Sequence, residues 1–248
     1  VKHFYLNEIR FVIQKDTVIE AIFRDPHTME LDGINFDFVS ISDVENVELG
    51  YNYIAENRVH TVSLSPYLIC KTEVTRDLYK KVMKDDPSAS FTPPNQTEIQ
   101  GKRPVERVTW FDAIAFCNEL TILLDGSDKE CYYYTDLSRK VPYRIADAKL
   151  KKDIYLPIPY TPKKGFRLPT EAEWEAAARY QGDGSKEEHK INATEYGSGV
   201  WLTNLDSASG AKANYETDPS EVKAVAWFKD NAENKTHPVG QLRANSLG

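Results

Sequence analysis

One segment of the chain, residues 166–174, restricts the local structure more than any other. It reads Phe-Arg-Leu-Pro-Thr-Glu-Ala-Glu-Trp. A threonine followed three residues later by a glutamate is the signature of a reciprocal N-terminal cap, so Thr170 and Glu173 predict the start of a helix. Glu175 and Arg179 are spaced to form an i, i+4 ion pair on it. Three residues are predicted to form its packed face: Trp174, Ala177 and Ala178.

Two further helices are predicted upstream. Thr75 is placed to cap a helix over residues 76–83, whose apolar residues fall on one face. Thr109 opens a second helix, which Gly126 is placed to end. The second helix carries apolar residues spaced by three or four, namely Ala113, Phe116, Cys117, Leu120 and Leu124. We expect Trp110 and Trp174 to lie in the core beneath these helices.

Period-two alternation of apolar and polar residues predicts strands in other parts of the chain. It is clearest at residues 34–38, after a turn at Asp32-Gly33, and at residues 59–64. A looser alternation spans residues 4–22, and residues 225–228 form an apolar, strand-like piece.

Three stretches predict irregular structure. Residues 85–102 are rich in Pro, Ser, Thr and Asn, and residues 182–210 are polar and rich in Gly and Ser. Residues 127–165 hold three consecutive tyrosines and a proline-punctuated stretch, and we expect no helix there.

Length and composition favour one main domain with an N-terminal extension. The 248 residues are 41% hydrophobic and 28% charged, which is enough apolar material for a core. The net charge of −7 argues against nucleic-acid binding, which depends on clustered Lys and Arg. No run of about 18 apolar residues occurs, so we expect a soluble chain without a transmembrane segment. Anchoring through a leader ahead of Val1 stays open.

Several segments together resemble one protein family in order and spacing. They are residues 59–64, 71–75, 103–113, 116–118, 166–174, 236–240 and 245–248. The chain resembles the sulfatase-modifying-factor family, whose founding members are formylglycine-generating enzymes. The resemblance implies an α+β, C-type-lectin-like fold of the formylglycine-generating-enzyme type, with few helices, twisted antiparallel strands and much irregular loop. Residues 34–248 are expected to form this domain, and residues 1–33 an N-terminal extension.

The resemblance does not extend to the chemistry of the enzymes. Their Gly-Asn-x-x-Glu-Trp and Arg-Gly-Gly-Ser-Trp stretches and their redox-active cysteine pair are not found, and we expect this part to follow Gly248. Cys70, Cys117 and Cys131 precede that region, and their odd number fits neither a dense disulfide framework nor a four-ligand zinc site. We therefore predict no catalytic and no cofactor-binding residue, and we expect Cys117 to be a small buried hydrophobe.

The resemblance also implies a candidate calcium site. Family members hold calcium through asparagine side chains and backbone carbonyls; Asn214 lies about where one such asparagine falls, and Asp218 is close enough to add an oxygen. The alternative is that both are ordinary loop residues. The five histidines include no i, i+4 pair of the kind that binds zinc on a helix, and His237 is expected to be a structural turn residue.

Two functions follow as hypotheses. The first is a non-enzymatic binding or display protein for a protein or carbohydrate ligand, at the cell surface or otherwise outside the cytoplasm. In this class the chain is similar to the variable proteins of diversity-generating retroelements, which are usually exposed at the cell exterior. The aromatic supply of 14 Tyr, 10 Phe and 4 Trp supports it, since Tyr and Trp make efficient recognition surfaces. The second is a formylglycine-generating enzyme or related oxidoreductase whose catalytic segment lies beyond this chain.

Overall fold

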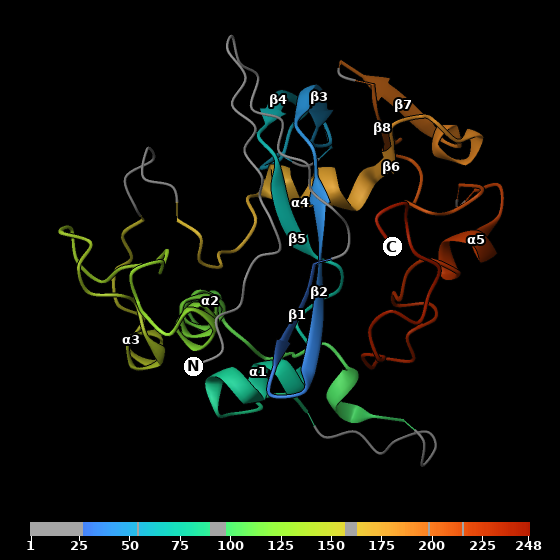
Figure 1. Cartoon of the computed structure of the whole chain (residues 1–248). Coiled ribbons are helices and arrows are strands. Elements are labelled where there is room, and N and C mark those ends of the chain that lie inside the picture. Colours follow the sequence, from blue (N-terminus) through green and yellow to red (C-terminus); the bar gives the residue numbers. More distant parts are fainter. Residues whose placement is uncertain (1–26, 54, 90–97, 157–162, 198, 215) are drawn as a thin grey trace, which may run out of the picture.

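A computed structural model describes residues 27–53, 55–89, 98–156, 163–197, 199–214 and 216–248. The first sheet has three antiparallel strands, with β2 (Ile34–Ile41) between β1 (His27–Leu31) and β5 (Tyr67–Cys70). Helices α1 (Arg76–Met83) and α2 (Trp110–Asp125) lie at one end of β2, and α4 (Glu171–Arg179) lies toward the other end (Figure 1). The strand predicted at residues 34–38 is confirmed and extends to Ile41.

Two smaller sheets flank α4 (Glu171–Arg179). One pairs β3 (Val44–Leu49) with β4 (His60–Leu64), which confirms the strand predicted at residues 59–64. The other has the order β6 (Tyr180–Gly182), β8 (Val200–Thr203), β7 (Ala193–Tyr196). Strands β7 and β8 lie in the polar stretch 182–210, which the sequence predicted as irregular, so that prediction is wrong for these residues. The polar and glycine-rich composition of the stretch gave no sign of two short antiparallel strands.

The three predicted helix starts are confirmed, together with their capping residues. Thr75 caps α1 (Arg76–Met83) by accepting from the Leu78 amide. Thr109 forms a capping box at the start of α2 (Trp110–Asp125), which ends at Gly126 in the left-handed conformation. Thr170 and Glu173 form the reciprocal box of α4. Each cap satisfies amide groups that have no partner inside the helix.

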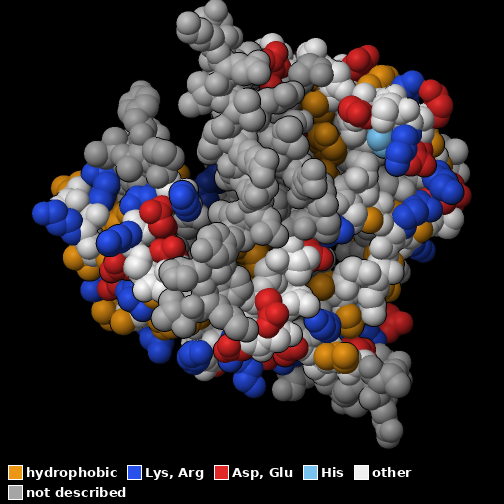
Figure 2. All heavy atoms as spheres, in the orientation of Figure 1, with side chains coloured by type: hydrophobic (Ala, Val, Ile, Leu, Met, Phe, Trp, Pro, Cys, Tyr) orange, Lys and Arg blue, Asp and Glu red, His pale blue; other side chains and the backbone are white. Residues whose placement is uncertain are grey.

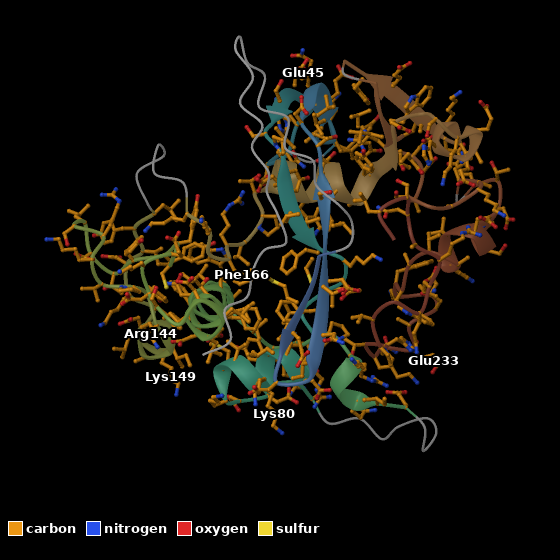
Figure 3. All side chains as sticks on the ribbon, in the orientation of Figure 1. Glu45, Lys80, Arg144, Lys149, Phe166 and Glu233 are labelled. Carbon is orange, nitrogen blue, oxygen red and sulfur yellow. The ribbon has the colours of Figure 1, made fainter. Side chains whose placement is uncertain are left out.

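Two clusters of buried apolar side chains make the core. The first joins α1 and α2 to β1 and β2, and the second joins β3, β4 and β8 to α4. Ile114 of α2 and Leu202 of β8 are both 0% exposed, and burial of such a side chain contributes about 1.5–3 kcal/mol. Phe166, labelled in Figure 3, extends the first cluster through Phe38 of β2, with ring centroids 5.6 Å apart.

The prediction that Trp110 and Trp174 lie in the core is wrong. The two side chains are 55% and 60% exposed. In α4 the buried face consists of Glu173, Ala176 and Ala177, whereas Ala178, like Trp174, is exposed. The cause lies outside the helix: Arg167 donates two hydrogen bonds to the Glu173 carboxylate, at 2.5 and 2.7 Å, and so holds that side chain against the domain. Positions one residue apart differ by about 100° around a helix, which turns Trp174 toward solvent.

The prediction of no helix in residues 127–165 is wrong for the described part of this segment, residues 127–156 and 163–165. They contain a helix, α3 (Ile145–Leu150), and Tyr134 makes isolated bridges to Pro142 and Tyr155. Asn118 of α2 ties this segment to the core. Its amide nitrogen donates to the carbonyls of Tyr133 (2.8 Å) and Tyr143 (2.9 Å), and its oxygen accepts from the amides of Tyr132 (3.0 Å) and Tyr133 (3.2 Å). Four hydrogen bonds made by one buried side chain therefore anchor the segment, in addition to its own buried residues Tyr133, Tyr134 and Tyr143.

The strand predicted at residues 225–228 is also wrong. The segment follows α5 (Pro219–Lys223) and consists of turns and irregular backbone. Trp227 stacks on His237 with ring centroids 3.8 Å apart, and the adjacent Thr236 carbonyl accepts from Arg103, which is 0% exposed. These contacts connect the C-terminal segment to residues 98–105.

The predicted boundary between residues 33 and 34 falls in the turn of the β1–β2 hairpin. β1 pairs with β2 along its length, and Leu31 lies in the first core cluster. Residues 27–33 therefore belong to the sheet of the domain. The rest of the predicted extension, including the alternation at residues 4–22, lies outside the described residues, as do parts of the predicted loops at residues 90–97 and 157–162.

Candidate functional site

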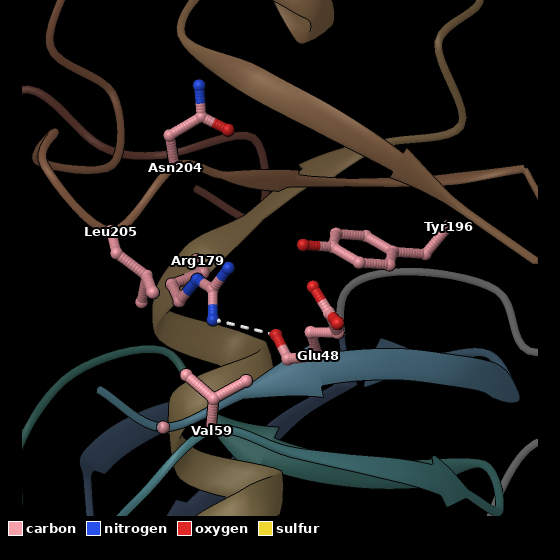
Figure 4. Close-up of a pocket in the computed structure, with 7 residues that line it drawn as sticks. Glu48, Val59, Arg179, Tyr196, Asn204 and Leu205 are labelled. Carbon is pink, nitrogen blue, oxygen red and sulfur yellow. Dashed lines mark hydrogen bonds between the residues drawn. The ribbon is translucent and has the colours of Figure 1, made fainter. Parts of the chain in front are cut away.

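The most promising site is a cavity of about 170 Å³ where α4 ends between the two small sheets. We call it the Arg179 cavity. Figure 4 shows its lining, which comes from β3, from the segment before β4, from the end of α4, from β7 and from the segment after β8. The lining residues are Glu48, Gly50, Val59, Arg179, Tyr196, Asn204 and Leu205.

Helix α4 positions the central cation of this cavity. Arg179 forms the predicted i, i+4 ion pair with Glu175, at 2.7 Å, and both side chains are almost buried, at 12% and 13% exposed. The guanidinium also donates to two backbone carbonyls, from Nε to Thr203 (2.9 Å) and from Nη1 to Glu48 (3.1 Å). Arg179 therefore joins α4, β8 and β3 at one point. Nη2 has no partner among the described residues.

The same ion pair holds the loop between β3 and β4. Both Glu175 carboxylate oxygens accept from the Gly50 amide at 2.9 Å, and Oε2 also accepts from the Asn57 side chain at 3.4 Å. Gly50 has a φ of 87°, and a Cβ placed there would lie 2.4 Å from the Arg58 carbonyl oxygen. Only glycine fits this conformation and this close approach. The rim of the cavity is thus fixed by backbone geometry.

Three polar side chains complete the lining. Figure 4 shows the Tyr196 hydroxyl pointing toward the Arg179 guanidinium and the Glu48 carboxylate lying between β3 and the Tyr196 ring. The Asn204 oxygen accepts from the Thr194 hydroxyl at 2.7 Å, which leaves its amide nitrogen as a donor. The Glu48 carboxylate has no partner among the residues that the structure describes. Donors and acceptors therefore face one small space.

The three cysteines do not form a reactive site. All are free thiols; Cys117 and Cys131 are buried, which confirms the prediction for Cys117, and Cys70 is half-buried. Burial raises the pKa of Cys117 to about 12 and that of Cys131 to about 11, and it also raises the pKa of Cys70. Nucleophilic chemistry needs the thiolate, so none of these thiols is activated.

The predicted calcium ligands are used within their own turn. The Asn214 side-chain oxygen accepts from the Thr217 amide at 2.9 Å, and its carbonyl accepts from the Asp218 amide at 2.9 Å. Asp218 caps α5 through Ser220, from which its carboxylate accepts two hydrogen bonds. Across the described ranges, no three His, Cys, Asp or Glu residues are grouped so that they could hold a metal ion. Calcium binding stays a prediction.

The sequence singled out Arg179 only as half of a helical ion pair. Glu48, Tyr196 and Asn204 gave no signal, because an isolated polar residue on a strand, or just after one, cannot be told from ordinary surface in the sequence. The loop glycine at position 50 was the one local clue, since glycine permits the left-handed backbone that it adopts here.

On the described part of the face shown in Figure 2, Lys and Arg side chains are interspersed with Asp and Glu. Within the described residues, no helix combines the length and the apolar character needed to cross a bilayer.

Comparison with known proteins covers most of the chain. Residues 37–248 match the family model of the sulfatase-modifying factor enzyme 1-like domain. Among solved structures, the chain is similar to Treponema denticola variable protein 1, with a TM-score of 0.65 and 35% identity, covering 91% of this chain and 72% of that one. The structure named CarF has a TM-score of 0.51 at 21% identity, with coverage of 86% and 74%, and supports the fold alone. The architecture is the predicted α+β, C-type-lectin-like fold of the formylglycine-generating-enzyme type.

A curated relative is the protein named chaperone protein LppX from Paenibacillus barcinonensis. It is 36% identical over 193 residues, which cover 75% of this chain. The chain spans 59% of the length of that relative.

Proposed function

The chain belongs to the family of the sulfatase-modifying factor enzyme 1-like domain, and from this premise we propose that it is a non-enzymatic ligand-binding protein. In this proposal the C-type-lectin-like scaffold holds loops and a variable surface that meet a partner outside the cytoplasm. The scaffold suits this role because short helices and small sheets fix the bases of long connecting segments, on which binding residues commonly lie.

The similarity to Treponema denticola variable protein 1 carries the proposal, because it extends over 91% of this chain at 35% identity. A variable protein of a diversity-generating retroelement presents randomised side chains on a constant framework. The buried contacts of Asn118 and Arg103 are of the framework kind, since they connect segments that are far apart in the sequence. In this proposal these residues belong to the constant frame.

The state of the thiols supports a binding role over catalysis by the described residues. Burial raises the pKa of all three cysteines, and no two of them form a disulfide. The ligand is a protein or a carbohydrate. The relative from Paenibacillus barcinonensis is named a chaperone protein, and a protein with that role would bind another protein.

The rival function is a formylglycine-generating enzyme or related oxidoreductase whose catalytic segment lies outside these residues. The name of the matched family favours it. The decisive assay uses the complete gene product and a sulfatase-derived peptide that contains the target cysteine, with mass spectrometry to detect conversion of that cysteine to an aldehyde. We expect no aldehyde, while an active formylglycine-generating enzyme run in parallel converts the peptide. Aldehyde formation by the complete protein would overturn the proposal.

A second test addresses the variable-protein identity itself. Sequencing the gene beyond this segment and comparing it with its template copy should reveal substitutions confined to adenine positions. A downstream segment identical to the template, or one that contains a cysteine pair beside Arg-Gly-Gly-Ser-Trp, contradicts that identity.

A further inference from the structure

We infer that the Arg179 cavity binds one ring of a neutral carbohydrate. This inference rests on the proposed ligand-binding function and names a ligand class for one site of the scaffold.

Charge disfavours an anionic ligand. An anionic group entering the cavity meets the Glu48 carboxylate, and Arg179 is already paired with Glu175 at 2.7 Å, so it offers little net positive potential to an anion. Like charges at close range are destabilising, most of all where water is partly excluded. A neutral ligand with many hydroxyl groups avoids this conflict and can donate to the Glu48 carboxylate.

The free hydrogen-bonding groups match a polyhydroxyl ring. Glu48 offers two acceptor oxygens, the Asn204 amide nitrogen and Arg179 Nη2 offer donors, and the Tyr196 hydroxyl can do either. A sugar hydroxyl donates one hydrogen bond and accepts others at the same time. Adjacent hydroxyls on one ring can therefore use a carboxylate and an amide or guanidinium together. Hydrogen bonds to charged groups are the stronger kind, which suits the capture of a well-hydrated ligand.

Apolar surface is available for the C–H groups of the ring. Val59 and Leu205 are 37% and 46% exposed at the edge of the cavity, and the Tyr196 ring forms one side of it (Figure 4). The cavity, of about 170 Å³, has room for a single ring.

The lining is also held in place before any ligand arrives. Glu175 fixes Arg179 and the Gly50 amide at once, and Arg179 fixes the carbonyls of Glu48 and Thr203. Ordering of loops and side chains is a large part of the cost of binding. A rim already anchored to a nearly buried ion pair avoids much of that cost.

The test measures binding of simple neutral sugars to the full chain. Saturation-transfer-difference NMR with the methyl glycosides of glucose, galactose, mannose and N-acetylglucosamine would reveal which, if any, contact the protein. Methyl glucuronide and methyl glucosaminide serve as anionic and cationic probes of the same size. We expect at least one neutral glycoside to bind with a Kd on the order of 1 mM, and methyl glucuronide to bind at least about tenfold more weakly because of the Glu48 carboxylate. Tighter binding of methyl glucosaminide than of any neutral glycoside would show that Glu48 selects a cation.

Variants locate the binding. Asn204→Ala and Glu48→Ala should each weaken it by about tenfold or more, since each removes a hydrogen bond to a neutral ring. Glu45→Ala is the matched control, because Glu45 is an exposed glutamate on the same strand that does not line the cavity (Figure 3). It should leave binding unchanged. Glu48 is exposed at the surface and its carboxylate has no partner within the described part of the chain. Glu48→Ala should therefore fold even if Asn204→Ala does not.

The inference is overturned if no neutral glycoside gives a signal or if a charged analogue binds more tightly than every neutral glycoside. It is also overturned if Glu48→Ala and Asn204→Ala bind as tightly as the native protein. Displacement of a bound glycoside by a lysine-rich peptide with higher affinity at this cavity would also overturn it in favour of a protein ligand. The outcome is separable from that of the aldehyde assay. A protein that forms no aldehyde and binds no sugar keeps its proposed role and loses this site, whereas aldehyde formation removes the role itself.

Discussion

Removal of the Asn118 side chain should destabilise the protein more than almost any other single polar change. Asn118 is 0% exposed and makes four hydrogen bonds to the backbone of the 127–165 segment. In Asn118→Ala the Tyr143 carbonyl and the Tyr133 amide lose this partner within buried residues. The Tyr133 carbonyl keeps a second bond, from the Tyr143 amide at 2.8 Å.

The magnitude follows from those two orphaned groups. An unsatisfied buried donor or acceptor costs about 1–3 kcal/mol, so two of them cost about 2–6 kcal/mol. The total stability of a domain is only about 5–15 kcal/mol. For a protein of this size, a loss of about 4 kcal/mol corresponds to a decrease in Tm of about 8–16 °C. Asn118→Asp should be at least as severe at neutral pH, because a carboxylate cannot donate to the two carbonyls.

The assay is equilibrium urea unfolding, followed by tryptophan fluorescence and by circular dichroism to check that both report one transition. Asn52→Ala is the control, since Asn52 lies exposed in a turn, and it should change the free energy of unfolding by less than about 0.5 kcal/mol. A loss of less than about 1 kcal/mol in Asn118→Ala would refute the reasoning. It would mean that water or a backbone shift satisfies the orphaned groups.

Three further changes test other parts of the structure. Gly50→Ala should lower the free energy of unfolding by about 1–3 kcal/mol, because it forces a left-handed φ and a clash with the Arg58 carbonyl; unchanged urea midpoints would contradict this. Burial acts to raise the pKa of Glu173, but hydrogen bonds from Arg167 and Thr170 outweigh it and hold that pKa below its usual 4.5. The ionised Glu173 carboxylate therefore stabilises the fold above about pH 4.5, and this stabilisation is lost as the pH falls through the lower pKa of the folded state. The urea midpoint of the native protein should accordingly fall more steeply between about pH 5 and pH 3 than that of Glu173→Gln. Parallel slopes would show that the ion pair is not formed in solution. Cys117 and Cys131 should react with iodoacetamide far more slowly in the native than in the urea-unfolded protein at about pH 8, since burial keeps both thiols protonated and covered; equal rates by mass spectrometry would contradict the buried placement.

Local features of the chain were readable from the sequence because their causes are local. A threonine caps amides two or three residues away, so Thr75, Thr109 and Thr170 identified three helix starts without knowledge of the fold. The alternation at residues 34–38 and 59–64 predicted strands for the same reason. The ordered motifs added the family and the fold, which the match over residues 37–248 bears out.

Long-range contacts were not readable in this way. The buried face of α4 is the one that packs Ala176 and Ala177 into the second core cluster, whose other members include residues of β3, β4 and β8, and Trp174 is left in solvent. The β6–β8–β7 sheet forms from a polar segment because β8 presents Val200 and Leu202 to the second core cluster, a surface that the segment itself does not specify.

The sequence by itself therefore determined the family, the three capped helices, the strands with regular alternation and the burial of Cys117. Tertiary structure alone decided which helix faces are buried, that residues 127–165 fold around Asn118, and that an ion pair on α4 meets Glu48, Tyr196 and Asn204 around one cavity. The physical reason is distance along the chain: capping and alternation act over a few residues. The cavity brings together side chains up to about 150 positions apart, and only the packed core places them there.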